Sequence, residues 1–369
     1  MRLLHVHSGN LFGGVETLLV TLARYRALCP AMDSRIAVCF EGRLQAELAA
    51  LGQPPRMLAA ARLRRPWTVA RARRRLATLL REEPIDAVVC HGPWPHLLFA
   101  GIARHQRLPV VLWLHGPVQS HWLDRLALRW QPDLVICNSR FTAQSLAGPT
   151  RDVPSAVVYC PVAARASAPG ARAAVRAALG VPADTVVIVQ VGRLEPWKGN
   201  REHLTALAAL RDVPNWVSWH VGGAQRPQEQ RHLDALVALA EREGLGSRVR
   251  FLGERRDVPD LLAAADVYVQ PNTGAEPFGQ TFVEALLAGL PVVTSAFGGA
   301  LEIVDDGCGV LVPPGDTAAL ARTLGALIGD PGRRARLGVE GPARARALCD
   351  PATQLAAIRT TVASTLVAA

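Results

Sequence analysis

Lysine is almost absent from this chain of 369 residues: 40 of its 41 basic residues are arginines, and Lys198 is the exception. Charged residues amount to only 20% while half of the chain is apolar, which excludes an intrinsically disordered protein. Aromatic residues are also scarce, at 5%. Because there is no zinc-finger or repeated basic motif either, the composition argues against a dedicated nucleic-acid binder despite a net charge of +10.

The seven cysteines include no CxxC pair and several stand in apolar runs, so we expect buried free thiols in a reducing compartment. No apolar run approaches the roughly 18 residues that are needed to cross a bilayer. The opening MRLLHVHSGN has too short an apolar core for a signal peptide and is typical of a first strand. We therefore expect a soluble, cytoplasmic protein.

The basic excess is confined to the first part of the chain. Residues 1–165 hold 21 basic and 10 acidic side chains, whereas residues 166–369 hold 20 and 21. Coding bias can account for most of the arginines, but nine of them lie from Arg56 to Arg81, where apolar residues recur at helical spacing. This basic helix either rests on an anionic membrane surface, at the inner face of the cytoplasmic membrane, or covers a sheet with its arginines in solvent. The two roles are compatible.

Short Val/Ile/Leu runs alternate with longer amphipathic segments along the whole chain, which predicts an α/β protein with parallel sheets covered on both faces. The length favours two doubly wound domains. We place an N-terminal domain at 1–165, a C-terminal domain at 166–350 and a last helix at 351–369 that packs back on the N-terminal domain, with a linker at Pro161–Gly170. The predicted strands are Leu3–His7, Arg35–Phe40, Ala87–Cys90, Val110–Leu114, Leu134–Cys137, Val157–Tyr159, Val186–Val191, Val217–Val221, Val249–Leu252, Val267–Gln270 and Val292–Ser295.

Three motifs follow predicted strands, where such folds bind ligands. The first is GGVE, in which Gly13 and Gly14 stand at the start of a predicted helix. The two glycines either let the backbone come close to a bound phosphate or form a tight turn between strand and helix. The second, VGRLEPWKG, places Arg193 and Lys198 in a loop where both cations suit a diphosphate.

The third motif, EPFGQTFVEALLAGLPVVTS, holds Glu276 in a loop and Glu284 on the helix that follows. The backbone amides at 279–281 lie at the positive end of that helix and form a second candidate phosphate site. Thr281 and Glu284 also fit a T-x-x-E capping box, which by itself would account for the glutamate.

These motifs, together with GGALEIVDDGCGVLVPPGD, resemble the GT-B-fold retaining glycosyltransferases of family four, the glycosyl transferases group 1. The resemblance extends over nearly the whole chain and is strongest over residues 186–316. It implies two Rossmann-like domains facing across a cleft, with the acceptor on the N-terminal side. It also implies transfer of a hexose from a UDP- or GDP-sugar to a hydroxyl acceptor, often lipid-linked, in the biosynthesis of cell-surface polysaccharides or glycoconjugates.

The resemblance also assigns roles to residues. Arg193 and Lys198 would neutralise the departing diphosphate. Glu276 would contact hydroxyls of the donor sugar, and His115 would face the same sugar. Trp197 stands where the family often has a small residue, which bears on the shape of the donor pocket. The other implied donor contacts are Gly13 and Gly14 at the diphosphate, Arg255 at the base, Glu284 at the ribose, and Phe278, Gly279, Gln280 and Thr281 at the sugar and phosphate.

Polar residues after other strands are candidates for the acceptor side. His91 follows a strand, and Ser139 and Arg140 follow another, where a helix cap explains them equally well. His5 and His7 share one strand face and are either a metal pair or, as we favour, packed histidines.

No Asp-x-Asp motif, a pattern that could bind a metal ion, follows a predicted strand. The acidic pair Asp305–Asp306 lies in a segment whose composition predicts a turn. We therefore expect no cofactor and a metal-independent transfer, with attack of the acceptor from the front face. Two alternatives stay open: a GT-B-type epimerase or phosphorylase, and a non-catalytic protein that binds sugar nucleotides or nucleic acid through its basic half.

Overall fold

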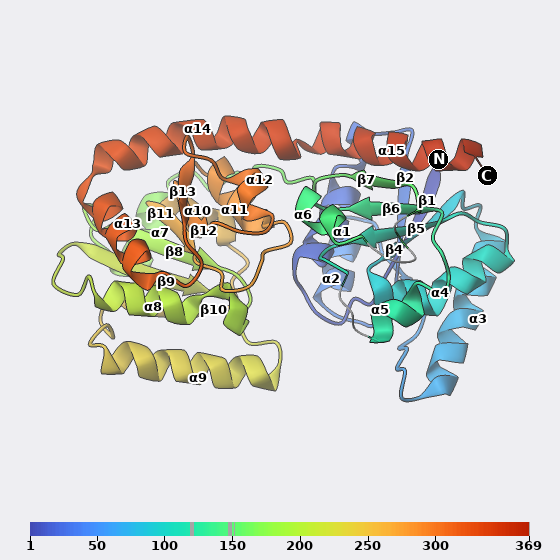
Figure 1. Cartoon of the computed structure of the whole chain (residues 1–369), viewed down its shortest axis with the longest axis horizontal. Helices are drawn as coiled ribbons and strands as arrows, with labels where there is room; N and C mark the ends of the chain where they lie inside the picture. Colours follow the sequence, from blue (N-terminus) through green and yellow to red (C-terminus); the bar gives the residue numbers. More distant parts are fainter. Residues whose placement is uncertain (119–121, 147–149, 151, 369) are drawn as a thin grey trace. The chain divides into compact units, whose positions relative to one another are not determined.

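The structure is a computed structural model that describes residues 1–118, 122–146, 150 and 152–368. Its contacts divide the chain into two compact units (Figure 1). Unit 1 comprises Met1–Val162 and Cys349–Ala369, and unit 2 comprises Ala163–Leu348.

Unit 1 is built on a seven-stranded sheet in the order β3-β2-β1-β4-β5-β6-β7, and its strand pairs are parallel. Helices on both faces bury the sheet, which explains strands that are apolar almost throughout. Its elements are β1 (Arg2–His7), α1 (Gly14–Arg24), η1 (Arg26–Leu28), β2 (Asp33–Val38), α2 (Arg43–Ala50), β3 (Arg56–Met57), α3 (Pro66–Glu82), β4 (Ala87–His91), α4 (Pro93–His105), β5 (Val110–Leu114), α5 (Trp122–Ala127), β6 (Leu134–Cys137), α6 (Arg140–Gln144), β7 (Ser155–Val157) and α15 (Pro351–Ala368).

The two faces of β1 and β4 differ in chemistry. Leu4, Val6 and Cys90 belong to a buried apolar cluster with Leu76 of α3 and Leu98 of α4. Because side chains alternate along a strand, the neighbouring histidines of β1 and β4 point to the opposite face.

Unit 2 is built on a six-stranded parallel sheet in the order β10-β9-β8-β11-β12-β13. Ile188 of β8 and Val269 of β11 pack in one buried cluster with Leu204, Leu236 and Leu324 of three covering helices. Its elements are α7 (Ala171–Ala178), β8 (Val186–Val191), η3 (Pro196–Lys198), α8 (Asn200–Ala208), β9 (Trp216–Val221), α9 (Pro227–Arg242), β10 (Val249–Gly253), α10 (Val258–Ala264), β11 (Val267–Gln270), α11 (Gln280–Leu287), β12 (Val292–Ser295), α12 (Ala300–Ile303), β13 (Gly309–Val312), α13 (Thr317–Gly329) and α14 (Pro331–Cys349).

The two doubly wound parallel sheets confirm the predicted fold class. Two predicted strands are displaced by two residues each. The strand predicted at Arg35–Phe40 is β2, Asp33–Val38, and the one predicted at Val157–Tyr159 is β7, Ser155–Val157. The two strands that the sequence did not predict are short. Arg56–Met57 has only two residues and no apolar run, and Gly309–Val312 directly follows a turn at residues 306–308.

In each unit the strand order reverses next to the first strand. In unit 1 the chain runs from β1 through β2 to β3 and then returns to β4 on the other side of β1. In unit 2 it runs from β8 through β9 to β10 and then returns to β11 on the other side of β8. Ligands of open α/β sheets bind at the carboxyl ends of the strands at such a reversal. These two points therefore position the candidate site residues.

Candidate active site

Lys198 and Glu276 form the centre of the site in unit 2. Lys198 follows β8 and Glu276 follows β11, and their side chains meet at 2.5 Å between Nζ and Oε2. The same carboxylate oxygen accepts hydrogen bonds from the amides of Gln270, at 3.2 Å, and Asn272, at 3.3 Å. Both amide residues are buried, and Glu276 is only 8% exposed. Neither amide was expected from the sequence, although buried polar residues at a strand end are a recognisable signal.

Trp197 supports the lysine and does not displace it. The ammonium of Lys198 lies 4.0 Å from the centre of the Trp197 ring, in a cation–π contact. The carbonyl of Trp197 accepts the amides of Thr273 and Gly274 from the loop after β11. The residue that departs from the family pattern thus ties the two loops of the site together.

The backbone around Lys198 needs a glycine. Gly199 has φ +72°, and a Cβ atom there would lie 1.8 Å from the carbonyl oxygen of Pro271. The carbonyl of Lys198 accepts a hydrogen bond of 2.9 Å from Gln190, whose oxygen is 3.0 Å from Nδ1 of His203. The buried side chains of Gln190 and His203 therefore fix the backbone of Lys198.

Arg193 is held by acidic residues of unit 2. Its guanidinium contacts Glu229 at 2.5 Å and Glu195 at 3.3 Å. Burial would raise the pKa of Glu229, but hydrogen bonds from the Gln225 amide and Arg193 hold that pKa below its usual value. Glu229 lies 36 residues along the chain, so no local motif predicts it.

The helix that follows Glu276 begins at Gln280, with Gly279 as its N-cap at φ +98°. This start rules out the T-x-x-E capping box, because Thr281 already lies inside the helix and no side chain caps it. Phe278 is buried just before the cap. The amides of Gln280 and Thr281 stand in the first turn, whose N–H groups favour an anion.

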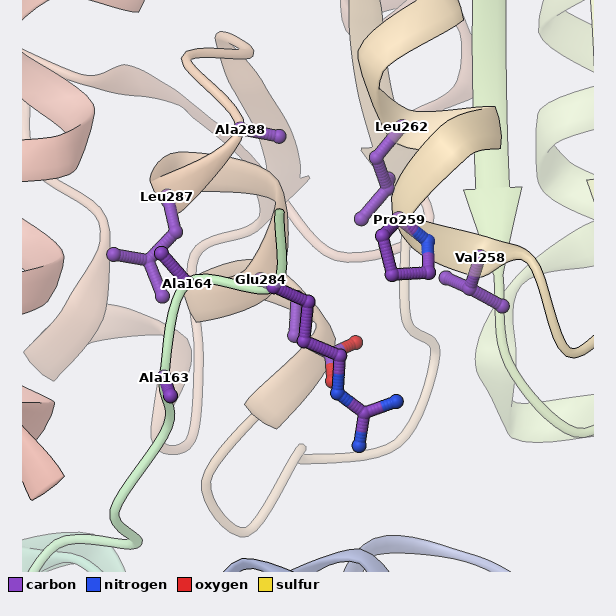
Figure 2. Close-up of a pocket in the computed structure, with 9 residues that line it drawn as sticks. Ala163, Ala164, Val258, Pro259, Leu262, Glu284, Leu287 and Ala288 are labelled. Atoms are coloured by element: carbon purple, nitrogen blue, oxygen red, sulfur yellow. The ribbon is translucent and has the colours of Figure 1, made fainter. Parts of the chain in front are cut away.

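Glu284 lines a pocket of about 410 Å³ in unit 2 (Figure 2). Burial raises the pKa of its carboxyl group, and the nearby Arg165 opposes that shift. Arg255 is not among the residues that line the pocket in the described structure. It forms a bidentate pair with Asp257, at 2.8 and 2.6 Å, just before α10. The lining residues are Ala163, Ala164, Arg165, Val258, Pro259, Leu262, Glu284, Leu287 and Ala288.

In unit 1, the GGVE motif is joined to β1 through its glutamate. Glu16 accepts the amide of Gly13 at 2.9 Å, and its other oxygen lies 2.7 Å from Nε2 of His7. Gly14 is the first, exposed residue of α1. The structural role of Glu16 follows from its position three residues after the cap, the reciprocal half of a capping box.

His5, His91 and His115 form a chain of side chains at the reversal point of unit 1. Nδ1 of His5 lies 2.9 Å from Nε2 of His91, and Nδ1 of His91 lies 2.9 Å from Nε2 of His115. His5 therefore pairs with His91 and His7 with Glu16, which supports packed histidines over a metal pair. Among the described residues, no group of three or more His, Cys, Asp or Glu side chains is arranged to hold a metal ion.

Ser139 and Arg140 begin α6. Ser139 is fully buried and caps the helix, accepting the amide of Thr142 at 3.0 Å. Arg140 is exposed on the first turn. Ser139 is thus confirmed as the N-terminal cap of α6, and contact of Ser139 or Arg140 with an acceptor stays a prediction.

All seven cysteines lie in the described part of the chain, where they are buried and form no disulfide, as expected. Across the helices within residues 1–118, 122–146, 150 and 152–368, none combines the length and apolar character needed to span a membrane.

We expect unit 1 to lose stability as the pH falls below 6.5, the usual pKa of histidine. Burial lowers the pKa of His5 and His96 to about 4. Between these values the unfolded chain binds protons that the folded chain excludes, so stability rises with pH and is lost on acidification. Urea unfolding at about pH 7 and about pH 5 measures the difference. His96→Gln keeps a donor for the Trp130 carbonyl and should reduce the loss, whereas an unchanged loss would contradict this account.

Comparison with known proteins places both units in one family. Residues 12–165 match the family described as Glycosyltransferase Family 4, and residues 171–344 match the one described as Glycosyl transferases group 1. A D-inositol 3-phosphate glycosyltransferase of Xylanimonas cellulosilytica is 41% identical over 180 residues, 48% of this chain and 42% of that protein. One from Mycobacterium sp. strain KMS is 36% identical over 203 residues, 54% of this chain and 45% of that protein. The chain thus aligns with less than half the length of these curated relatives.

Solved structures match over the whole length. Anabaena Alr3699/HepE in complex with UDP and glucose is 27% identical with a TM-score of 0.86, covering 99% of this chain and 100% of that one. The same protein in complex with UDP-glucose is 28% identical, with the same TM-score and coverage. The two family matches, and a fold shared over nearly every residue, show that this chain belongs to the group 1 glycosyl transferases, the retaining family-four enzymes with the GT-B fold.

Proposed function

We propose that this chain transfers a hexose from a uridine-diphosphate sugar to a hydroxyl acceptor, with retention of configuration and without a metal ion. Unit 2 would hold the donor and unit 1 the acceptor. The observation that carries the proposal is the Lys198–Glu276 pair at the strand reversal of unit 2, a cation and a carboxylate fixed side by side. Support for uridine comes from Anabaena Alr3699/HepE, a relative solved in complex with UDP and glucose and in complex with UDP-glucose.

In this proposal the cations act on the leaving group. Breaking the bond between the sugar and the diphosphate builds negative charge on the departing nucleotide. Lys198, together with Arg193, would stabilise that charge, and the first-turn amides of α11 would add donors. Both cations are held in ion pairs, Arg193 with Glu229 and Glu195 and Lys198 with Glu276, so each is fixed in place before the donor binds.

The carboxylates would act on sugars. Glu276, oriented by Gln270 and Asn272, would accept hydrogen bonds from hydroxyls of the transferred sugar. Glu284, on the wall of the 410 Å³ pocket, would do so for the ribose. Arg255 would reach the base only by leaving Asp257, which makes it the weakest of the assigned contacts.

In unit 1, we propose that His115 contacts the transferred sugar and that the backbone at Gly13–Gly14 approaches the diphosphate. His91, Ser139 and Arg140 remain candidates for the acceptor side. Arg140, which is exposed, is the best suited of the three. Ser139 and His91 are buried, and their polar atoms already bond to Thr142 and to His5 and His115, respectively.

A thermal-shift series tests the donor. UDP at about 100 times its dissociation constant should stabilise the fold by about 2.7 kcal/mol and raise the melting temperature by roughly 5–10 °C. GDP is the matched control and should shift it less. An equal or larger shift with GDP would reverse the assignment of the base, and no shift with either nucleotide would count against a nucleotide-sugar donor. Products formed with and without an acceptor distinguish a transferase from an epimerase or a phosphorylase.

We further propose that α3 binds an anionic membrane surface, as expected if the acceptor is a lipid-linked intermediate of a cell-surface glycan. Trp67, Arg71 and Arg74 are exposed and recur at i, i+4 and i+7, on one face of the helix. Trp67 is 65% exposed. Not every arginine contributes, because Arg73 donates to the carbonyl of Leu98 and Arg56 pairs with Glu83.

Vesicle flotation tests this surface. Each arginine near an anionic surface contributes about 1 kcal/mol, so replacing Arg71 and Arg74 by alanine should weaken binding to phosphatidylglycerol vesicles by about 30-fold. Arg242→Ala with Arg322→Ala, two exposed arginines of unit 2, is the matched control and should bind like the unchanged protein. Binding that is insensitive to salt and to both pairs would contradict the proposal.

A further inference from the structure

The histidine chain of unit 1 links three strands through side chains alone. His5 lies in β1, His91 ends β4, and His115 follows β5 directly. The register of the sheet produces this alignment, since His91 stands opposite Trp113 and His115 lies two residues further on the same side of its strand. The rings of His91 and His115 stack with 5.1 Å between centroids and 11° between planes. Trp113 stacks on both rings, which restricts their rotation.

The two ends of the chain differ in their surroundings. At the inner end, Nε2 of His5 is buried and has no hydrogen-bond partner within the described residues. At the outer end, His115 is only partly buried and uses Nε2 to reach His91, so its Nδ1 is the remaining ring nitrogen. The other titratable groups beside the chain are His7 and Glu16, which bond to each other.

A count of protons leaves two arrangements. Burial lowers the pKa of His5 to about 4 and that of His115 to about 3, and it lowers the pKa of His91 well below the usual value, so all three rings are neutral near pH 7. A neutral imidazole carries one N–H, so both hydrogen bonds must run in the same direction. Either every ring carries its proton on Nδ1, or every ring carries it on Nε2.

The buried end decides between the two arrangements. Protons on Nε2 would leave the N–H of His5 buried without an acceptor, and orphaned buried N–H groups are rare. Protons on Nδ1 leave only an unpaired ring lone pair at that position, which costs less. In that second arrangement the chain donates outward, from His5 to His91 and from His91 to His115.

We propose that His5 and His91 are positioning residues that fix His115 as its Nδ1–H tautomer, so that it presents a hydrogen-bond donor to an oxygen of the bound sugar. The part that concerns the sugar rests on the proposed function, whereas the tautomer does not. A neutral donor suits an uncharged hydroxyl, and it leaves Lys198 and Arg193 as the cations that meet the leaving diphosphate.

Long-range proton–nitrogen NMR of the full chain with nitrogen-15-labelled histidine reads the tautomers directly. We expect His5, His91 and His115 as Nδ1–H forms, assigned by the signals that each single substitution removes. His96 is an internal reference, because its Nε2 must donate to the carbonyl of Trp130, 2.6 Å away. Nε2–H forms for the three chain members would overturn the proposal.

Two substitutions of His91 separate the effect of its hydrogen bond to His115 from the effect of its ring stacking. Asparagine places an amide donor where Nδ1 of His91 stands, so His91→Asn should keep His115 as its Nδ1–H form. His91→Phe keeps a ring in the stack but has no donor, so it should yield a mixture of tautomers at His115 and lower kcat about tenfold with little change in KM. An unchanged tautomer in His91→Phe would overturn the positioning role. Nδ1–H forms together with a fully active His115→Gln would overturn the role in transfer and leave the chain of hydrogen bonds standing.

Discussion

Replacing Lys198 by alanine lowers kcat by about 10²–10³-fold in this account, while the protein stays folded. A charge-stabilising donor that acts mainly in the transition state has an effect of that size. The loss should appear in kcat and kcat/KM alike, because the interaction strengthens as charge develops on the leaving group. Steady-state kinetics with a UDP-sugar donor measures it.

Lys198→Arg is an informative companion in a chain that otherwise uses arginine. The compact ammonium fits between Glu276, 2.5 Å away, and the Trp197 ring, 4.0 Å away, and a planar guanidinium does not match that space. We expect only partial recovery. Arg201→Ala, which removes an exposed cation from the adjacent helix α8, is the control and should be fully active. Full activity of Lys198→Ala would exclude the lysine from the reaction.

Gly199→Ala should destabilise unit 2 by about 3–5 kcal/mol, among the largest effects of a single substitution. The positive φ of 72° is unfavourable for alanine, and the added Cβ would lie 1.8 Å from the carbonyl oxygen of Pro271, so the backbone must move. Because that backbone carries Lys198, activity should fall as well. Thermal unfolding should show a melting temperature lower by roughly 10 °C.

Gly180→Ala separates the strain of a positive φ from the steric clash that the added Cβ makes at position 199. Gly180 also has a positive φ, of 56°, but no atom lies within 4 Å of an added Cβ. It should cost only about 1–2 kcal/mol. Equal losses for the two variants would show that the approach to Pro271 does not matter.

The parts of the site that follow strands were predictable from the sequence. Apolar runs mark β8 and β11, and the loops that follow them lie at the carboxyl edge of the sheet, so Lys198 and Glu276, one in each loop, could be named together. Their contact at 2.5 Å depends on topology, since 78 residues separate them.

The partners of the predicted residues were not predictable, because they come from other segments. Glu229 pairs with Arg193 from α9, and Asp257 engages Arg255. The start of α11 at residues 279–281 agrees with the expectation, but the capping box at Thr281 and Glu284 is wrong, since a T-x-x-E pattern cannot reveal that Gly279 takes φ +98° and is the N-cap. Helix boundaries follow local backbone geometry, which tertiary contacts set.

Whether this chain is a retaining transferase that relies on Lys198 is decided by the cleavage of nucleotide sugars by the unchanged protein. A panel of UDP- and GDP-sugars is followed by proton NMR, which reports both the release of the nucleoside diphosphate and the anomer first formed. We predict that at least one UDP-sugar is cleaved with retention, and that Lys198→Ala cleaves it about 10²–10³-fold more slowly. Inversion of configuration, or equal rates for the two proteins, would contradict the account.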